Sequence, residues 1–115
     1  MELATSCYAV VRRMPLHEEF GLRSQIRRAA VSIPANVAEG YGRNSTRDYL
    51  RFLYVARGSL NELETHLLLA ERFGYLHQAE IAGLMVRVEA LGRILQGLCR
   101  ALETRMARSS RANMP

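Results

Sequence analysis

Apolar residues recur every three or four positions along most of the chain, the spacing that places side chains on one face of an α-helix. Gly, Pro and cap residues divide this pattern into four stretches, and none of them alternates in the manner of a β-strand. We therefore expect helices at about residues 2–13, 18–39, 46–73 and 78–106. Residues 107–115 are rich in Ser, Arg and Asn and are expected to form a flexible C-terminal tail.

Helix-breaking and capping residues set these predicted boundaries. Pro34 lies inside the second stretch and lacks a backbone donor, so the sequence predicts a kink or a break near residues 31–33. The glycines of residues 40–42 are expected to end this helix, because glycine adopts the left-handed conformation at no steric cost. Residues 45–48 (STRD) resemble a capping box and should begin the third helix.

The connections between the four stretches are short, so consecutive helices must lie antiparallel, and each helix has one apolar face to bury. The sequence predicts an all-α fold, an antiparallel up-down-up-down four-helix bundle spanning residues 1–106. A length of 115 residues with 49% apolar and 23% charged residues is typical of one globular domain. No apolar run is as long as a membrane span, and Glu2 stands where a signal peptide carries positive charge. We expect a cytoplasmic protein without membrane contact.

Polar residues recur beside the apolar stripe of the second helix, at Gln25, Arg28, Ser32, Asn36 and Glu39. On the third helix, Ser59 and Glu62 flank the apolar face, beside Gly58, which would permit close backbone approach. If the hairpin pairs around Gly42, Arg28 lies opposite both of these residues. We expect a buried or half-buried polar seam in which Arg28 pairs with Glu62. In the same seam Ser32, Asn36 and Ser59 exchange hydrogen bonds. A ligand pocket lined by Arg28, Asn36 and Glu39, or a plain solvated face, are the alternatives.

The chain carries a net charge of +5, which biases its surface toward polyanions. All 16 of its basic residues are arginine, which codon bias explains as readily as a need for bidentate phosphate contacts. Arg43, Arg47 and Arg51 recur at four-residue spacing, and helical phase places Arg47, Arg51 and Tyr54 opposite the apolar stripe of the third helix. Such a surface could hold a nucleic-acid backbone without reading its sequence. An ordinary solvated arginine face explains the pattern as well. The candidate nucleic-acid contacts are Arg23, Arg27, Arg43, Arg47, Arg51, Arg93 and Arg100.

Nothing in the sequence has the spacing of an enzyme active site. It lacks a phosphate-binding loop, the nucleophile and zinc motifs of hydrolases, and paired catalytic carboxylates. His17, His66 and His77 are far apart and are not accompanied by acidic residues at metal-ligand spacing. Cys7 and Cys99 are expected to be reduced and partly buried. We expect no catalytic residue, no metal and no cofactor.

Two segments resemble a known family. Residues 25–43 (QIRRAAVSIPANVAEGYGR) and 52–64 (FLYVARGSLNELE) are similar to the bacterial four-helix-bundle proteins encoded in intervening sequences of 23S ribosomal RNA genes. The resemblance covers residues 15–75, whereas the first helix is shorter than usual and the fourth matches only in pattern. It implies a cytosolic bundle that assembles as a ring-shaped homopentamer. It also implies kinship with the accessory variability proteins of diversity-generating retroelements, basic pentamers that bind nucleic acid and a reverse transcriptase.

Two functions are compatible with these observations. In the first, the protein is a nonenzymatic homo-oligomer that binds RNA or DNA nonspecifically through surface arginines. In the second, it is a homo-oligomeric scaffold for a protein partner, with Leu69, Met85 and Val86, apolar residues off the main stripes, marking the interfaces.

Overall fold

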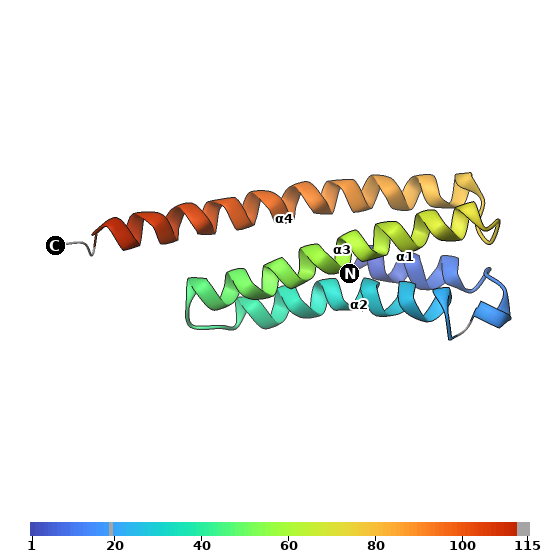
Figure 1. Cartoon of the computed structure of the whole chain (residues 1–115), viewed down its shortest axis with the longest axis horizontal. Coiled ribbons are helices and arrows are strands. Elements are labelled where there is room, and N and C mark those ends of the chain that lie inside the picture. Colours follow the sequence, from blue (N-terminus) through green and yellow to red (C-terminus); the bar gives the residue numbers. More distant parts are fainter. Residues whose placement is uncertain (19, 113–115) are drawn as a thin grey trace.

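Four α-helices form an antiparallel bundle in the computed structural model of the chain, which describes residues 1–18 and 20–112 (Figure 1). The helices are α1 (Glu2–Val11), α2 (Leu22–Tyr41), α3 (Thr46–Arg72) and α4 (Gln78–Ala112), and a short 3-10 helix, η1 (Leu16–Glu18), connects α1 to α2. Consecutive helices run in opposite directions, and no strand occurs in the described residues. The predicted all-α up-down-up-down bundle is confirmed.

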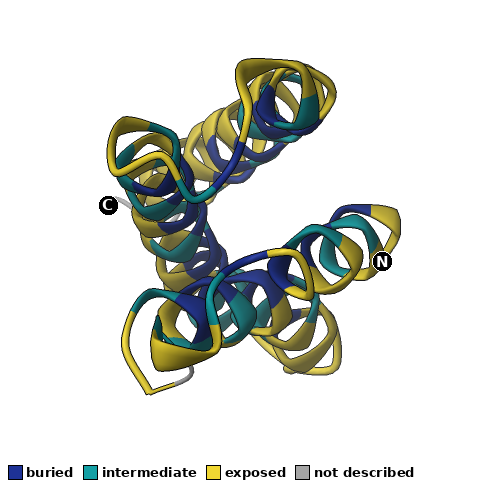
Figure 2. Ribbon diagram, turned by 90° about the vertical axis from the view of Figure 1, so that its right-hand side faces the viewer, coloured by how far each residue is buried: buried dark blue, intermediate teal, exposed yellow. Residues whose placement is uncertain are grey.

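The core lies along the axis of an elongated molecule that measures 61 × 22 × 19 Å. The buried positions of the helices face one another across this axis (Figure 2). α2 packs most extensively against α3, and α3 against α4. Apolar residues at helical spacing fill this core, and Leu53, Leu63 and Leu67 of α3 are fully buried. Burial of each such side chain contributes roughly 1.5–3 kcal/mol.

α2 differs from its predicted form at both ends and at its centre. It begins at Leu22, after η1, and continues through Pro34 and Gly40 to Tyr41. Pro34 removes only one backbone hydrogen bond, and Ile33 is buried in the core just before it, so packing holds the helix together. Among the described residues only Gly74, directly after α3, has a positive φ (78°). The left-handed stop predicted at residues 40–42 is therefore wrong, whereas the predicted end of α3 has this geometry.

α4 continues beyond residue 106, where the sequence predicted its end, to Ala112. Ala and Arg are good helix formers, and extending an existing helix costs much less than starting one. Residues 107–112 therefore form helix rather than irregular chain, and residues 113–115 lie outside the described residues. Within the described part of the chain, no helix is both long enough and apolar enough to cross a membrane.

Candidate nucleic-acid interface

The contact between α2 and α3 determines how the turn between them is presented. Ser32 Oγ lies 2.8 Å from Ser59 Oγ, and Asn36 Nδ2 donates to the Ser32 carbonyl oxygen at 2.8 Å and to Ser32 Oγ at 3.0 Å. Ser32 therefore lies opposite Ser59, as their predicted hydrogen bond requires, whereas Arg28 lies one helical turn away from Ser59. The turn begins after Tyr41, so the hairpin pairs closer to Ser45 than to Gly42.

This register changes the predicted polar seam. Only its centre, Ser32, Asn36 and Ser59, is partly buried and joined by hydrogen bonds. Among the described residues no ion pair joins Arg28 to Glu62, and both side chains are exposed because each is turned away from the α2–α3 contact. The other two predicted members, Gln25 and Glu39, are also exposed. Arg28 and Glu39 consequently do not converge with Asn36 on a ligand pocket.

The close approach between α2 and α3 occurs at Gly40 rather than at Gly58. A Cβ atom at Gly40 would lie 2.8 Å from Phe52 Cβ and 3.0 Å from Tyr49 Cδ1. A Cβ atom at Gly58 would meet nothing within 4 Å. The buried glycine thus lets the last turn of α2 press against the first turns of α3, which fixes the turn that joins them.

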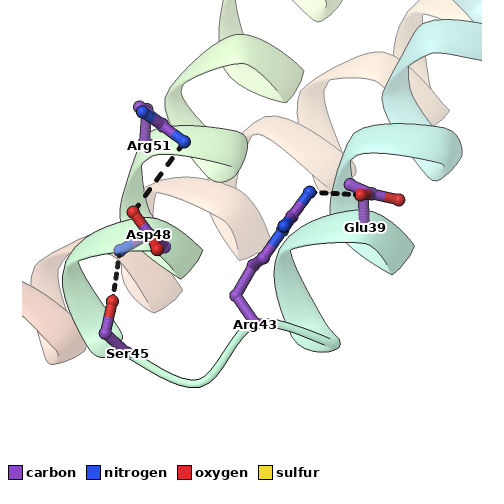
Figure 3. Close-up of polar contacts among 5 residues, drawn as sticks. All are labelled: Glu39, Arg43, Ser45, Asp48 and Arg51. Carbon is purple, nitrogen blue, oxygen red and sulfur yellow. Dashed lines mark hydrogen bonds and ion pairs between the residues drawn. The ribbon is translucent and has the colours of Figure 1, made fainter.

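Polar side chains order this turn (Figure 3). Ser45 Oγ caps α3 by accepting from the Asp48 backbone N–H at 3.1 Å, and Arg51 lies 3.8 Å from the Asp48 carboxylate. Arg43 forms an ion pair with Glu39 at the end of α2. The guanidinium carbons of Arg43 and Arg51 also lie 4.9 and 5.6 Å from the centre of the Phe52 ring. Two of the predicted arginines are therefore held beside one another at the turn.

Most of the net charge gathers at one end of the bundle. The last turns of α4 lie at the same end as the α2–α3 turn (Figure 1). Residues 39–51 and 100–112, here called the basic end, contain seven arginines and three acidic residues, a net charge of +4. The rest of the chain has nine arginines and eight acidic residues, a net charge of +1. The arginines of the basic end, all exposed, are Arg43, Arg47, Arg51, Arg100, Arg105, Arg108 and Arg111.

The structure separates the other predicted arginines from this end. Arg23 is only 7% exposed, and its Nη1 donates to the Met14 carbonyl oxygen at 3.5 Å, so it holds the α1–α2 connection. Arg27 is half-buried, and Arg93 is exposed on the middle of α4. Arg23 is therefore not available as a surface contact. Arg108 and Arg111 were not predicted because residues 107–115 were expected to be irregular. Arg105 lies within the predicted fourth helix and was missed.

A cleft opens between α3 and α4 at the basic end, with a volume of about 450 Å³. It is lined by Arg47, Leu50, Arg51, Tyr54, Glu103 and Met106, and we refer to it as the α3–α4 cleft. The Tyr54 hydroxyl donates to Glu103 Oε2 at 2.8 Å, and this hydrogen bond raises the pKa of Tyr54. Tyr54 is 44% exposed, in agreement with its predicted place opposite the apolar stripe of α3, and it also forms one wall of the cleft.

An apolar groove of about 420 Å³ lies between α1, α2 and α4. It exists because α1 has 10 residues and α2 has 20, so that α1 leaves the second half of α2 uncovered. Its lining consists of Met1, Leu3, Ala4, Ala30, Ile33, Pro34, Val37, Ala38, Tyr41 and Leu91. Of the residues predicted to mark an interface, Val86 is 66% exposed, whereas Leu69 and Met85 are half-buried.

The described residues contain no group of three or more His, Cys, Asp or Glu side chains placed to hold a metal ion. Cys7 and Cys99 are both buried free thiols, and burial raises the pKa of Cys7 to about 11. A thiol with so high a pKa is a poor nucleophile at neutral pH, because the reactive form is the thiolate.

Comparison with known proteins identifies relatives over most of the chain. A family model described as 23S rRNA-intervening sequence protein matches residues 1–97. The crystal structure of a protein with unknown function from the S23 ribosomal protein family, from Bacteroides thetaiotaomicron, is 25% identical in sequence and superposes with a TM-score of 0.76. That similarity covers 85% of this chain and 92% of the other. No curated protein matches the chain.

Proposed function

The chain belongs to the 23S rRNA-intervening sequence protein family, and we propose that it is a nonenzymatic accessory protein whose basic end binds nucleic acid nonspecifically. The observation that carries this proposal is the concentration of a net charge of +4 in residues 39–51 and 100–112. Clustered arginines attract a polyanion more strongly than dispersed ones, because phosphates follow one another closely along a nucleic-acid strand.

The ion pairs at the α2–α3 turn leave this end positive. Arg43 and Arg51 share their charge with Glu39 and Asp48, whereas Arg47 forms no ion pair with any described residue. Guanidinium groups suit this task because they bind phosphate oxygens through two parallel N–H donors. Contacts of this kind neutralise phosphates without distinguishing bases, so the binding is expected to be independent of sequence.

Binding measurements across a salt series test the proposal. The protein should bind labelled RNA or DNA with an affinity that falls steeply as salt increases, because phosphate contacts release counterions. The double variant R47Q/R105Q should weaken binding and lower the salt slope by about 1 for each arginine removed. The matched control R28Q/R72Q removes the same charge from exposed positions outside the basic end. Equal losses in both variants, or no binding at low salt, would contradict the proposal.

A homo-oligomer is the second part of the proposal, supported by the apolar groove between α1, α2 and α4. Exposed apolar surface of this kind is usual at protein interfaces and unfavourable in water. The groove equally favours the alternative function, a homo-oligomeric scaffold that binds a protein and no nucleic acid. Light scattering on the wild type and on A38E, which places a charge on the groove lining, tests whether the protein is an oligomer and whether the groove is its interface. A monomeric wild-type protein would exclude the oligomer, and an oligomer that A38E leaves intact would exclude this groove as its interface.

A further inference from the structure

The α3–α4 cleft combines an apolar floor, an aromatic wall and a basic rim. Leu50 on the floor is buried and Met106 is half-buried, and both line the cleft. Tyr54 forms the wall and is held in place by its hydrogen bond to Glu103. A flat, partly exposed ring beside an apolar floor is a surface on which a nucleobase can stack, because every base has an aromatic face.

The acidic residue inside the cleft determines which part of a nucleotide can enter it. Glu103 accepts from the Tyr54 hydroxyl through Oε2, and its charge repels a phosphate group from the floor. The same carboxylate can accept a hydrogen bond from the exocyclic amine of a base. The interior of the cleft therefore suits a base better than a phosphate.

The rim has the opposite preference. Arg47 and Arg51 line the cleft from α3. A second depression shares Arg47 and Met106 with the cleft and adds Arg105 and Ser109 from α4, so the basic lining continues along the end of the bundle. A strand that follows this rim could place its phosphates against the arginines while one base turns inward.

From this arrangement we infer that the α3–α4 cleft seats an unstacked base on Tyr54, so that the basic end binds single-stranded nucleic acid in preference to duplex. This inference rests on the proposed function. A duplex presents phosphates on its outside but keeps the faces of its bases stacked within it, so it can use the rim and not the cleft. A single strand can use both.

The test compares single-stranded RNA and DNA oligonucleotides of about 12 nucleotides with duplexes of the same sequences, by fluorescence anisotropy at one salt concentration. The wild-type protein should prefer a single strand by at least about fivefold, the lower end of what one stacked base contributes. Y54A should lose this preference and keep its duplex affinity, whereas Y54F, which retains the ring, should keep both. Y8A is the matched control, because Tyr8 on α1 is 43% exposed and Tyr54 is 44% exposed.

Each other outcome overturns the inference. Salt-dependent binding with equal affinities for single strand and duplex would leave the proposed function in place and remove the cleft from it. An equal loss of both affinities in Y54A, with a circular dichroism spectrum like that of the wild type, would do the same. Absence of binding to every oligonucleotide would remove both proposals. In a competition experiment, polyglutamate of equal charge could displace the bound strand from the wild type and from Y54A equally well. That result would identify the site as a surface for acidic proteins.

Discussion

At the scale of single residues, Gly40 and Gly58 show which part of the contact between α2 and α3 the sequence could predict and which part it could not. The predicted close backbone approach was assigned to Gly58, whose place in α3 is exposed, while the contact occurs at Gly40. Helical phase identifies the face of a helix on which a residue lies, but close approach depends on where two helices cross, which follows from their register. The predicted register placed Arg28 opposite Ser59, where the structure places Ser32, one turn further along α2.

Alanine substitution at these two glycines should have opposite effects. G40A should destabilise the protein by roughly 1–3 kcal/mol despite the better helix propensity of alanine, because its Cβ would press against Phe52 and Tyr49. G58A should stabilise it by roughly 0.5–1 kcal/mol, since the position is helical and open. Urea unfolding of both variants measures the difference. A G40A variant as stable as G58A would show that α2 and α3 do not approach closely here.

Glu18 provides a prediction about pH. Its pKa is lowered from 4.5, first by the backbone N–H of Leu22, which donates to Oε2 at 3.0 Å, and then by the Tyr75 hydroxyl, which donates to Oε1 at 3.1 Å. Because the folded-state pKa lies below the unfolded one, the unfolded chain binds more protons and stability rises with pH through this range. The contribution is present above pH 4.5 and is lost as the pH falls through the folded-state pKa.

The E18Q variant should therefore melt at a lower temperature than the wild type at neutral pH, and the difference should shrink as the solution is acidified below pH 4.5. Melting curves followed by circular dichroism across this range provide the measurement. E62Q serves as the control, because it removes an exposed carboxylate from α3. A difference between wild type and E18Q that stays constant with pH would mean that the charge of Glu18 is not what stabilises the α1–α2 connection.

At the scale of helices, start signals were predicted better than stop signals. Ser45 caps α3 through the Asp48 N–H, and α3 begins at Thr46 as the sequence predicts. The cap is readable because it depends on residues three positions apart. The ends of α2 and α4 were wrong because Gly and Ser are permitted inside helices when tertiary packing or helix propagation favours them.

The cap at Ser45 should have a measurable effect on stability. S45A should lower the free energy of unfolding by about 1 kcal/mol, because the Asp48 N–H loses its acceptor. S45D should retain most of the stability, since a carboxylate also accepts at this position and is favoured by the helix dipole. Chemical denaturation distinguishes the two variants. Equal stability of S45A and the wild type would mean that water replaces the cap without cost.

At the scale of the whole molecule, the fold was predictable and the distribution of charge was not. Four apolar stripes and short connections are enough to specify an up-down-up-down bundle, and the core residues of α3 follow from the same periodicity. The basic end, in contrast, joins residues 39–51 to residues 100–112, which are distant in sequence. Their proximity follows only from the antiparallel packing of α3 and α4 and from the length of α4.

Because of this arrangement, the end of α4 belongs to the proposed binding surface, although the core does not need it to fold. A variant that ends at Met106 removes Arg108 and Arg111, and Leu102 is the last buried residue of α4. The variant should fold with nearly unchanged stability, because residues 107–112 are exposed. Its affinity for RNA or DNA should fall, and its salt slope should decrease by up to about 2, one for each phosphate contact removed.

Melting curves and anisotropy titrations on the same preparation separate the effect on stability from the effect on binding. If the slope is unchanged, phosphates bind elsewhere on the basic end, and the contacts reduce to Arg43, Arg47, Arg51, Arg100 and Arg105.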